Sequence, residues 1–293
     1  LLVIACPGAL VIATPVSFVA GIGNAAKKGI LFKGGESIEA LSKAKVLFLD
    51  KTGTLTKGKP ELQEILTFNG TDLENLRLAA IGESYSEHPL SKAIIEGASS
   101  KGLLVEEKPT TSEFSIGKGI TFVYNRSRYY LGNQKIIPFG LDKEIEESIE
   151  KLESKGMTVL IFADEMRILS LFGVRDALRS NVKELLSKLK KTGITKTVML
   201  TGDRLTVATS VAKEAGVDEV YASLLPEDKM NIIHQYKENN YNTVFVGDGI
   251  NDSPSLKQAD IGIALNSGAD IAKDAGDIVL VGNDLRMVKG ALE

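Results

Sequence analysis

Residues 46–56 read VLFLDKTGTLT, four apolar residues followed by an acidic residue and a turn rich in hydroxyl groups. The apolar run predicts a buried strand, and Asp50 stands where that strand ends. A carboxylate at a strand end, beside a donor-rich turn, suits a nucleophile that attacks a phosphoryl group and becomes an aspartyl phosphate. A single Asp at a strand end would more simply cap the turn, but the whole string from Asp50 to Thr56 favours the nucleophile.

The rest of the chain repeats this strand pattern. Apolar runs at 198–200 and 244–246 lead into Thr201-Gly202-Asp203 and into Gly247-Asp248, and further strands are predicted at 261–265 and 278–281. Helical patterns lie at 36–44, 204–215, 229–238 and 255–259. Alternation of this kind predicts an α/β fold with a doubly wound parallel sheet. Ligands of such sheets bind at the carboxyl ends of the strands, where these acidic residues would lie.

The interval between the predicted strands at 46–49 and 198–200 shows a different pattern of secondary structure. Strand-like runs at 121–124, 129–131, 158–162 and 168–172 are interspersed with helical patterns at 73–84, 90–99 and 143–154. This mixture predicts an α+β domain with an antiparallel sheet, inserted after the strand that ends at Asp50. We expect the inserted domain to span 59–172 and the discontinuous outer domain to span 24–58 and 173–288.

The acidic and basic residues near the predicted strand ends form a candidate phosphoryl-transfer site. Mg²⁺ prefers oxygen ligands, and Asp50, Asp248 and the main-chain carbonyl of Thr52 would supply three. Asp252 follows in the same loop as Asp248. The segment with Thr201 and Asp203, together with Lys229, offers a hydroxyl group, main-chain amides and a positive charge for phosphoryl oxygens.

Composition limits the class of protein. The chain has 293 residues, 43% of them hydrophobic and 25% charged, which is enough for two domains with buried cores. The net charge of -3 and the absence of a basic stretch with interleaved aromatic residues argue against a nucleic-acid partner. The single cysteine, Cys6, excludes an internal disulfide and a cysteine-cluster zinc site, which fits a reducing, cytosolic setting.

The amino-terminal stretch is uncharged as far as Lys27 and mostly apolar. At ~1.5 Å per residue, a helix over 1–26 would cross a ~30 Å hydrocarbon core. Pro7 and Pro15 argue against a buried core helix, whereas membrane helices tolerate proline beside a binding cavity. We expect residues 1–23 to be a transmembrane helix remnant, and the chain to be a piece of a larger membrane protein.

The strings at 50–56, 201–203 and 247–252 resemble those of the P-type ATPases, within the haloacid dehalogenase-like superfamily, and the resemblance covers essentially the whole chain. It implies that Asp50 is the phosphorylated nucleophile and that Asp248 is a magnesium ligand. It also implies that Lys229 and Thr201 contact phosphate and that Asp252 orders the metal site. Asp176 matches a family position where the inserted domain returns to the sheet, and either hinge or phosphate-loop support, or a helix cap, would explain it.

The inserted domain resembles that of the heavy-metal (CPx-type) branch, through Ser86-Glu87-His88-Pro89-Leu90. In that branch an upstream Glu, two spaced glycines and a Gly-Asn pair accompany the His-Pro pair and hold ATP. The matching residues here are Glu83, His88, Gly117, Gly119, Gly132 and Asn133. Glu83 and His88 could contact the adenine side. On its own, His88 would more often be a residue that starts a helix.

Cys6-Pro7-Gly8 resembles the metal-binding membrane motif of this branch, in which the third residue is commonly Cys. Cys6 is therefore the candidate ligand of the transported ion, and a thiolate suits Cu(I), Ag(I), Zn(II) or Cd(II). Copper is the most common cargo in the family, whereas the segments 11–16 and 23–29 look closer to the zinc and cadmium transporters. The resemblance leaves copper and zinc or cadmium both open.

The resemblance implies the catalytic fragment of an ATP-driven heavy-metal transporter, with ATP and Mg²⁺ as its cofactors. Its partners would be the heavy-metal ion, the remaining membrane helices and an actuator domain. The parent protein would lie in the cell membrane, with this fragment on the cytoplasmic side. The alternative is a soluble phosphatase of the same superfamily, but such enzymes place a second acid where this chain has Thr52. A non-catalytic nucleotide-binding regulator would not need both Asp50 and Asp248.

Overall fold

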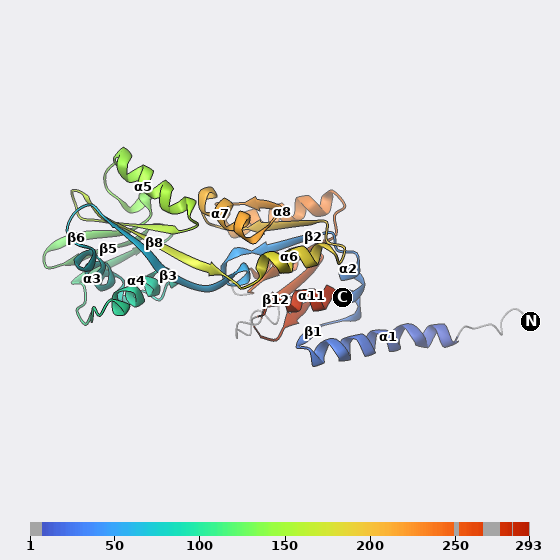
Figure 1. Cartoon of the computed structure of the whole chain (residues 1–293). Coiled ribbons are helices and arrows are strands. Elements are labelled where there is room, and N and C mark those ends of the chain that lie inside the picture. Colours follow the sequence, from blue (N-terminus) through green and yellow to red (C-terminus); the bar gives the residue numbers. More distant parts are fainter. Residues whose placement is uncertain (1–7, 249–251, 266–275, 283, 293) are drawn as a thin grey trace, which may run out of the picture. The chain divides into compact units, whose positions relative to one another are not determined.

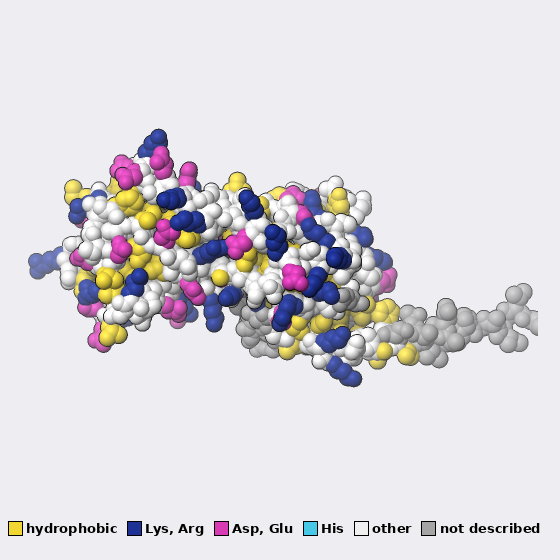
Figure 2. Space-filling model, viewed as in Figure 1, with side chains coloured by type: hydrophobic (Ala, Val, Ile, Leu, Met, Phe, Trp, Pro, Cys, Tyr) yellow, Lys and Arg dark blue, Asp and Glu magenta, His cyan; other side chains and the backbone are white. Residues whose placement is uncertain are grey.

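The computed structural model describes residues 8–248, 252–265, 276–282 and 284–292 (Figure 1). It divides into two compact units. Unit 1 comprises Leu1–Leu55, Arg179–Gly202 and Ala212–Glu293, and unit 2 comprises Thr56–Leu178 with Asp203–Val211. Side chains of both signs are intermingled on the face shown in Figure 2, which offers no continuous basic surface.

Unit 1 is built on a seven-stranded sheet with the order β1-β13-β12-β11-β2-β9-β10. The strands pair in parallel, except that β1 is antiparallel to β13. Its strands are β1 (Ile30–Phe32), β2 (Val46–Asp50), β9 (Lys196–Leu200), β10 (Glu219–Tyr221), β11 (Thr243–Gly247), β12 (Ile261–Leu265) and β13 (Ile278–Leu280). Its helices are α1 (Gly8–Lys27), α2 (Gly35–Ser42), α6 (Val182–Lys190), α8 (Pro226–Glu238), α9 (Ser253–Gln258) and α11 (Met287–Leu292). Helix α7 (Leu205–Ala215) is assigned to unit 2 as far as Val211 and to unit 1 from Ala212.

Strand β2 lies inside this sheet and is buried on both faces. Val46 and Phe48 pack in a core cluster with Ile233 of α8, and Leu47 and Leu49 point to the opposite face. A strand covered on both faces reads as a continuous apolar run, which is the pattern of the sequence here. The predicted doubly wound parallel sheet is confirmed.

The register of β2 sets the position of the site. Asp50 pairs with Leu200 of β9 on one side, and Leu49 pairs with Val246 of β11 on the other. The carboxyl ends of the three strands therefore lie level with one another. Thr201 and Asp248 come just after the two neighbouring ends, at the same edge of the sheet as Asp50.

Unit 2 contains a six-stranded antiparallel sheet with the order β3-β8-β7-β6-β5-β4, which confirms the predicted α+β insertion. The strands are β3 (Thr56–Thr67), β4 (Thr111–Ser115), β5 (Gly119–Tyr124), β6 (Ser127–Gly132), β7 (Thr158–Ala163) and β8 (Ile168–Leu178). The helices are α3 (Asp72–Gly82), α4 (Pro89–Ser100) and α5 (Lys143–Ser154).

Helices cover both faces of this sheet, with α5 on the face opposite α3 and α4 (Figure 1). The core under α3 and α4 includes Leu76, Ile94, Phe122 and Phe162. The core under α5 includes Ile145, Leu152, Val159 and Ile161. Alternate residues of β7 thus enter opposite cores, as the two-residue period of a strand requires.

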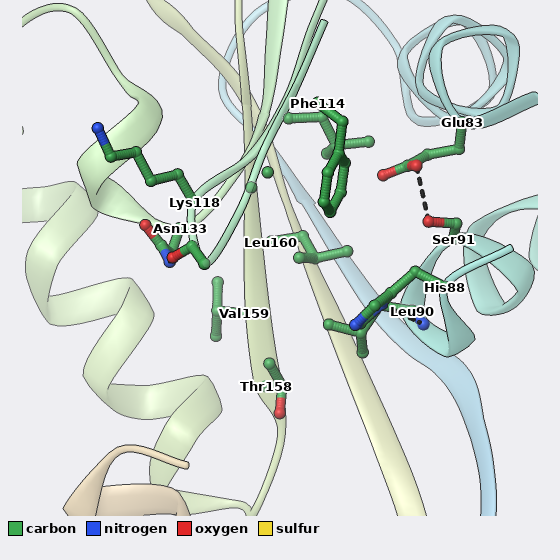
Figure 3. Close-up of a pocket in the computed structure, with 14 residues that line it drawn as sticks. Glu83, His88, Leu90, Ser91, Phe114, Lys118, Asn133, Thr158, Val159 and Leu160 are labelled. Atoms are coloured by element: carbon green, nitrogen blue, oxygen red, sulfur yellow. Dashed lines mark hydrogen bonds between the residues drawn. The ribbon is translucent and has the colours of Figure 1, made fainter. Parts of the chain in front are cut away.

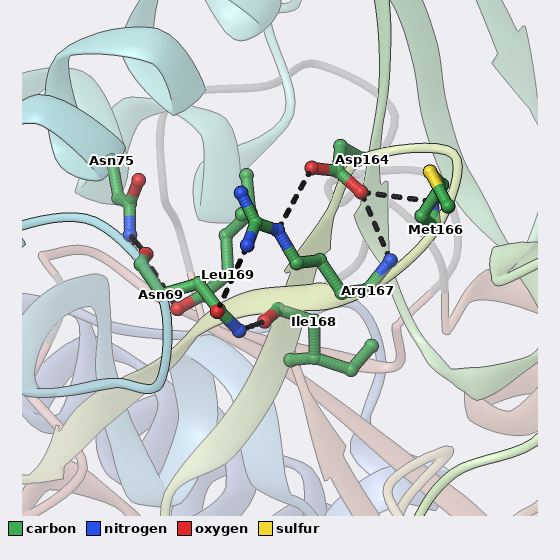
Figure 4. Close-up of polar contacts among 7 residues, drawn as sticks. All are labelled: Asn69, Asn75, Asp164, Met166, Arg167, Ile168 and Leu169. Carbon is green, nitrogen blue, oxygen red and sulfur yellow. Dashed lines mark hydrogen bonds and ion pairs between the residues drawn. The ribbon is translucent and has the colours of Figure 1, made fainter.

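Polar side chains tie the β7–β8 hairpin to the loop before α3 (Figure 4). Asp164 Oδ1 accepts a hydrogen bond from the main-chain N–H of Arg167 at 2.9 Å, and Arg167 Nη1 donates to Asn69 Oδ1 at 3.3 Å. Asn69 Nδ2 donates to the carbonyl of Ile168 at 2.7 Å. Asn75, which is only 3% exposed, donates from Nδ2 to the carbonyl of Asn69 at 2.7 Å. These bonds satisfy polar groups at the end of the sheet away from the junction with unit 1.

The two chain crossings into and out of unit 2 pair with each other, since Thr56 of β3 lies opposite Leu178 of β8. The Asp176 carboxylate accepts hydrogen bonds from Thr56 Oγ1 at 2.6 Å and from the main-chain N–H groups of Gly58 and Lys59, each at 3.1 Å. It satisfies β3 where the register shifts, and it caps no helix. These contacts do not fit the helix-cap interpretation of Asp176, and its role in hinge or phosphate-loop support stays a prediction. The antiparallel pair also extends the insertion beyond the expected 59–172.

Helix α1 extends from Gly8 to Lys27 and passes through Pro15. Among the described residues, no helix has both the length and the apolar character needed to cross a membrane. The predicted membrane segment over 1–23 begins outside the described residues, and Cys6 also lies outside them. That segment and its metal ligand stay predictions.

Candidate active site

Asp50 is the last residue of β2, and the turn Lys51–Leu55 follows it directly. Gly53 in this turn has a φ of 74°, in the left-handed region that favours glycine. A Cβ atom on Gly53 would lie 3.0 Å from Asp248 Oδ2. The turn therefore brings its backbone against the Asp248 carboxylate, and any side chain at position 53 would crowd that contact.

Lys229 of α8 joins two carboxylates at this edge of the sheet. Its Nζ lies 2.6 Å from Asp50 Oδ1 and 2.9 Å from Asp252 Oδ1. All three side chains are nearly buried, with exposed fractions of 14% for Lys229, 9% for Asp50 and 3% for Asp252. Charged hydrogen bonds in such a site are stronger than those at the surface because water does not compete for them.

Burial raises the pKa of Asp50 to about 7, with a further rise from the charge of Asp252 and a smaller one from Asp248, against the lowering effect of Lys229. Burial opposes the charge of Lys229, but the carboxylates of Asp50 and Asp252 outweigh it and raise the Lys229 pKa. The site thus holds the carboxylates of Asp50 and Asp252 around the Lys229 ammonium group, with the Asp248 carboxylate near Asp50. It has an excess of negative charge that a divalent cation would offset.

The end of β11 also needs its glycine, Gly247. A Cβ atom on Gly247 would lie 2.8 Å from Asp252 Oδ2, so Gly247 lets the Asp252 side chain fold back over the strand end. Asp252 immediately precedes α9 and faces Lys229. In this structure it acts first as a partner of the lysine.

The other predicted residues of this site have different surroundings. Thr201 is buried, and its main chain bonds to Tyr221 and Leu224. Asp203 comes two residues later, just before α7, and Thr52 is exposed in the turn. Thr52 has extended backbone angles, with φ -75° and ψ 125°.

The residues at this edge of the sheet can be compared with the ligands that a magnesium ion prefers. The described residues contain no group of three or more His, Cys, Asp and Glu side chains placed to hold a metal ion by themselves. Mg²⁺, however, is usually held by one or two carboxylates together with waters and substrate phosphates. Asp50 and Asp248, with the carbonyl of Thr52, fit that smaller set. Burial, and then the charges of Asp252 and Asp248, raise the pKa of Asp50, and a bound cation would lower it again.

Unit 2 contains a cavity of about 240 Å³ (Figure 3). All six residues predicted to hold a nucleotide line it: Glu83, His88, Gly117, Gly119, Gly132 and Asn133. Figure 3 shows Glu83 and Phe114 at one end, Asn133 and Lys118 to the side, and Leu160 of β7 between them. The cavity thus combines apolar walls with polar groups at its two ends.

Glu83 and His88 lie where α3 gives way to α4. Glu83 is 6% exposed, and its Oε2 accepts a hydrogen bond from Ser91 Oγ at 2.7 Å. Burial raises the pKa of Glu83. His88 Nδ1 accepts from the main-chain N–H of Leu90 at 3.2 Å, so the residue does start a helix, and it also lines the cavity. Burial lowers the His88 pKa, and the neutral ring, with Nδ1 as acceptor, carries its proton on Nε2.

The glycines are required by the close approach of β5 and β6. A Cβ atom on Gly132 would lie 2.1 Å from the carbonyl oxygen of Lys118, and one on Gly119 would lie 2.2 Å from that of Leu131. Asn133 Nδ2 donates to the carbonyl of Gly117 at 2.7 Å and so closes the β4–β5 turn over the cavity. Backbone thus forms this wall, which a ligand can approach closely.

Sequence reasoning missed the apolar walls of the cavity. Phe114 is 57% exposed although it lines the cavity, and Leu160 and Val159 of β7 lie below it. The available signal was weak, because TSEFS at 111–115 has a single apolar residue, Phe114, among polar ones and so shows no strand alternation. Phe114 pairs with Ile120, a core residue of β5, so it extends the core under α3 and α4 into the cavity.

The family model for haloacid dehalogenase-like hydrolases matches residues 44–260. A probable cadmium-transporting ATPase of Alkalihalophilus pseudofirmus is 40% identical over 97% of this chain and 40% of that protein. A copper-exporting P-type ATPase of Staphylococcus haemolyticus is 41% identical over 99% of this chain and 36% of that protein. The chain therefore spans about two fifths of the length of these relatives.

Solved structures give the same likeness. A zinc-transporting PIB-type ATPase superimposes with a TM-score of 0.77 and 36% identity, over 98% of this chain and 47% of that one. The catalytic domain of the CPx-ATPase CopB-B superimposes with a TM-score of 0.75 and 28% identity, over 92% of this chain and 98% of that one. The chain belongs to the haloacid dehalogenase-like hydrolase family, and these relatives and solved structures to which it is similar are heavy-metal P-type ATPases.

Proposed function

We propose that this chain is the ATP-binding and phosphorylated region of a heavy-metal-exporting P-type ATPase. The observation that carries the proposal is the cluster of Asp50, Lys229 and Asp252 at the end of β2, with Asp248 against the adjoining turn. The cavity of unit 2, which all six residues predicted to hold a nucleotide line, supports it independently. Each unit supplies one half of a phosphoryl-transfer reaction.

Asp50 is the nucleophile. A carboxylate oxygen of Asp50 bonds to the γ-phosphorus of ATP, the bond from that phosphorus to the β,γ-bridging oxygen breaks, and ADP leaves with the electron pair. The phosphoryl oxygens are contacted by Lys229 and by the main chain and hydroxyl group of Thr201. Asp203 supports the loop that carries Thr201. Water then hydrolyses the aspartyl phosphate.

Asp50, Asp248 and the carbonyl of Thr52 would hold Mg²⁺, and Asp252 would order the site through Lys229. The ion would neutralise charge on the phosphoryl group during transfer. Lys229 keeps Asp50 oriented before the phosphate arrives, through the 2.6 Å bond between them. A bound ion would also lower the pKa of Asp50, because its positive charge favours the ionised carboxylate.

ATP binds in the unit 2 cavity. Glu83 and His88 lie on the adenine side, and the backbone at Gly117, Gly119 and Gly132, with Asn133, meets the rest of the nucleotide. The γ-phosphate reaches Asp50 by a movement of one unit against the other. Phosphorylation of Asp50 therefore needs ATP as the phosphoryl donor, together with the Mg²⁺ described above.

A soluble phosphatase is the second candidate. Such an enzyme protonates its leaving group with an acid two residues after the nucleophile, and Thr52 has no proton of suitable pKa to give. The aspartyl phosphate of this chain is therefore long-lived, as a transport cycle needs. The names of its relatives also favour the transporter.

The whole protein would lie in the cell membrane, with this region on the cytoplasmic side. Its further parts would be the remaining membrane helices and an actuator domain. The ion is copper, or zinc or cadmium, since relatives named for each of these metals match the chain. Cys6 is its ligand in this chain.

The test is phosphorylation by ATP labelled at the γ-phosphate, with Mg²⁺ present. Acid-stable, hydroxylamine-labile label on the chain, lost in Asp50→Asn and kept in Asp142→Asn, is the expected result. Asp142 is an exposed residue of unit 2 and serves as the matched control. Failure of the unsubstituted chain both to take label and to bind ATP would refute the proposal.

A further inference from the structure

Arg179 is the first residue after β8, where the chain returns from unit 2 to unit 1. Its Nε donates a hydrogen bond to the carbonyl of Thr54 at 2.7 Å, and its Nη2 donates to the carbonyl of Gly53. Its main-chain N–H donates to the carbonyl of Leu55 at 2.9 Å. One residue thus holds three consecutive carbonyl groups of the turn that follows Asp50.

These bonds fix more than three oxygen atoms. Each peptide group is planar, so a carbonyl that is held in place also fixes the direction of the next amide N–H. Thr54 and Leu55 are fully buried, and their carbonyl groups would be costly to leave without a donor. The turn keeps its left-handed Gly53, close to Asp248, because its backbone is held from outside.

The positive charge of Arg179 acts on a carboxylate of unit 1, that of Asp284. The Asp284 carboxylate is held chiefly by hydrogen bonds from Arg286, and these together with the charge of Arg179 lower the pKa of Asp284. Asp284 therefore stays ionised beside Arg179 at neutral pH. The guanidinium group has the planar, multiply donating shape that reaches two carbonyl groups at once, which an ammonium group lacks.

We propose that Arg179 is a positioning residue for phosphorylation of Asp50. It holds the turn in the one conformation that brings the Thr52 carbonyl, Gly53 and the Asp248 carboxylate around the nucleophile. It touches neither ATP nor the phosphoryl group, so it acts on the rate of phosphoryl transfer and not on nucleotide affinity. This inference rests on the proposed function of Asp50.

The experiment compares Arg179→Gln and Arg179→Lys with the unsubstituted chain and with Arg128→Gln, an exposed arginine in unit 2. ATP affinity is measured by calorimetry, and the rate constant of phosphoenzyme formation is measured in a single turnover at saturating labelled ATP. Both Arg179 variants should bind ATP within twofold of the unsubstituted chain. Their rate constants should fall on the order of 100-fold, as displacement of reacting groups by about 1 Å does. Arg128→Gln should change neither quantity.

A third variant, Arg179→Ala, leaves space for an added guanidinium compound. Millimolar methylguanidinium should restore part of its rate, while methylammonium should not, and circular dichroism should confirm that the variant is folded. A variant that unfolds without the additive and refolds with it still supports the contact, but equal rates in all variants would refute the positioning role. A rate that falls only in proportion to ATP affinity would refute it too. If the unsubstituted chain takes no label, the proposed function itself fails, which separates the two ideas.

Discussion

Replacement of Lys229 by Met would remove the one ammonium group between two buried carboxylates. Lys229 Nζ makes bonds of 2.6 Å to Asp50 and 2.9 Å to Asp252, in side chains that are 14%, 9% and 3% exposed. Removing one member of a buried ion pair costs about 3–5 kcal/mol, and each charged hydrogen bond contributes about 1.5–3 kcal/mol. Two such bonds are lost here, so the free energy of unfolding of unit 1 should fall by about 3–5 kcal/mol at pH 8.

The loss should depend on pH in a defined direction. Burial and the charge of Asp252 already raise the Asp50 pKa to about 7, and without Lys229 it would rise further. A carboxyl group whose folded pKa lies above its unfolded pKa destabilises the fold as pH rises, because the unfolded chain ionises first. Protonation of Asp50 at pH 5.5 should therefore make the Lys229→Met deficit smaller than at pH 8.

The measurement is denaturant unfolding at the two pH values, for Lys229→Met and for Lys257→Met. Lys257 is an exposed lysine of α9, and its substitution should change stability by less than about 0.5 kcal/mol. The double variant Lys229→Met/Asp252→Asn should recover part of the loss, since one buried charge is then gone. A deficit below about 1 kcal/mol at pH 8, or one that grows at pH 5.5, would refute the argument.

Three further predictions concern the chemistry and the nucleotide. At low Mg²⁺, the rate of label transfer to Asp50 should rise with pH around about 7, because burial and Asp252 keep its carboxyl group protonated below that pH; a flat profile would contradict the raised pKa. Phe114→Ala should weaken ATP binding in calorimetry by roughly tenfold, as lost base stacking does, while Ile116→Ala, in the same hairpin but outside the cavity lining, should not; equal losses would point to a disturbed hairpin. Gly132→Ala should abolish ATP binding, because its Cβ would lie 2.1 Å from the carbonyl oxygen of Lys118. Unchanged ATP affinity would show that the backbone at this wall can shift to accept a side chain.

The elements that could be read from the sequence are those buried on both faces or strongly periodic. Strand β2 is a continuous apolar run, and α5 separates its apolar and charged residues clearly. Strand β3 escaped prediction because it lies at the edge of its sheet, where it carries Lys57, Lys59 and Pro60. Such residues protect sheet edges and also hide the strand pattern.

Some residues of the site could likewise be predicted from the sequence, and others could not. Asp50 could be found because its string is local, and Asp248 because it follows a second apolar strand. Other contacts join segments that are separated in the chain. They are the hydrogen bond from Lys229 to Asp252 and those from Arg179 to the carbonyl groups of Gly53 and Thr54. No spacing rule gives such contacts, since they depend on how the sheet brings strand ends together.

The order of strands in unit 1 also has a consequence for how the chain is made. Strand β2 pairs with β9 and β11, which begin at Lys196 and Thr243, 146 and 193 residues beyond Asp50. At ~5–20 residues per second, a ribosome needs roughly 10 to 40 s to supply both neighbours. Unit 2, whose sheet strands lie in one stretch, is complete within that interval. The apolar segment 46–49 is without its two neighbouring strands until translation is far advanced, so we expect a chaperone to help the nascent chain there.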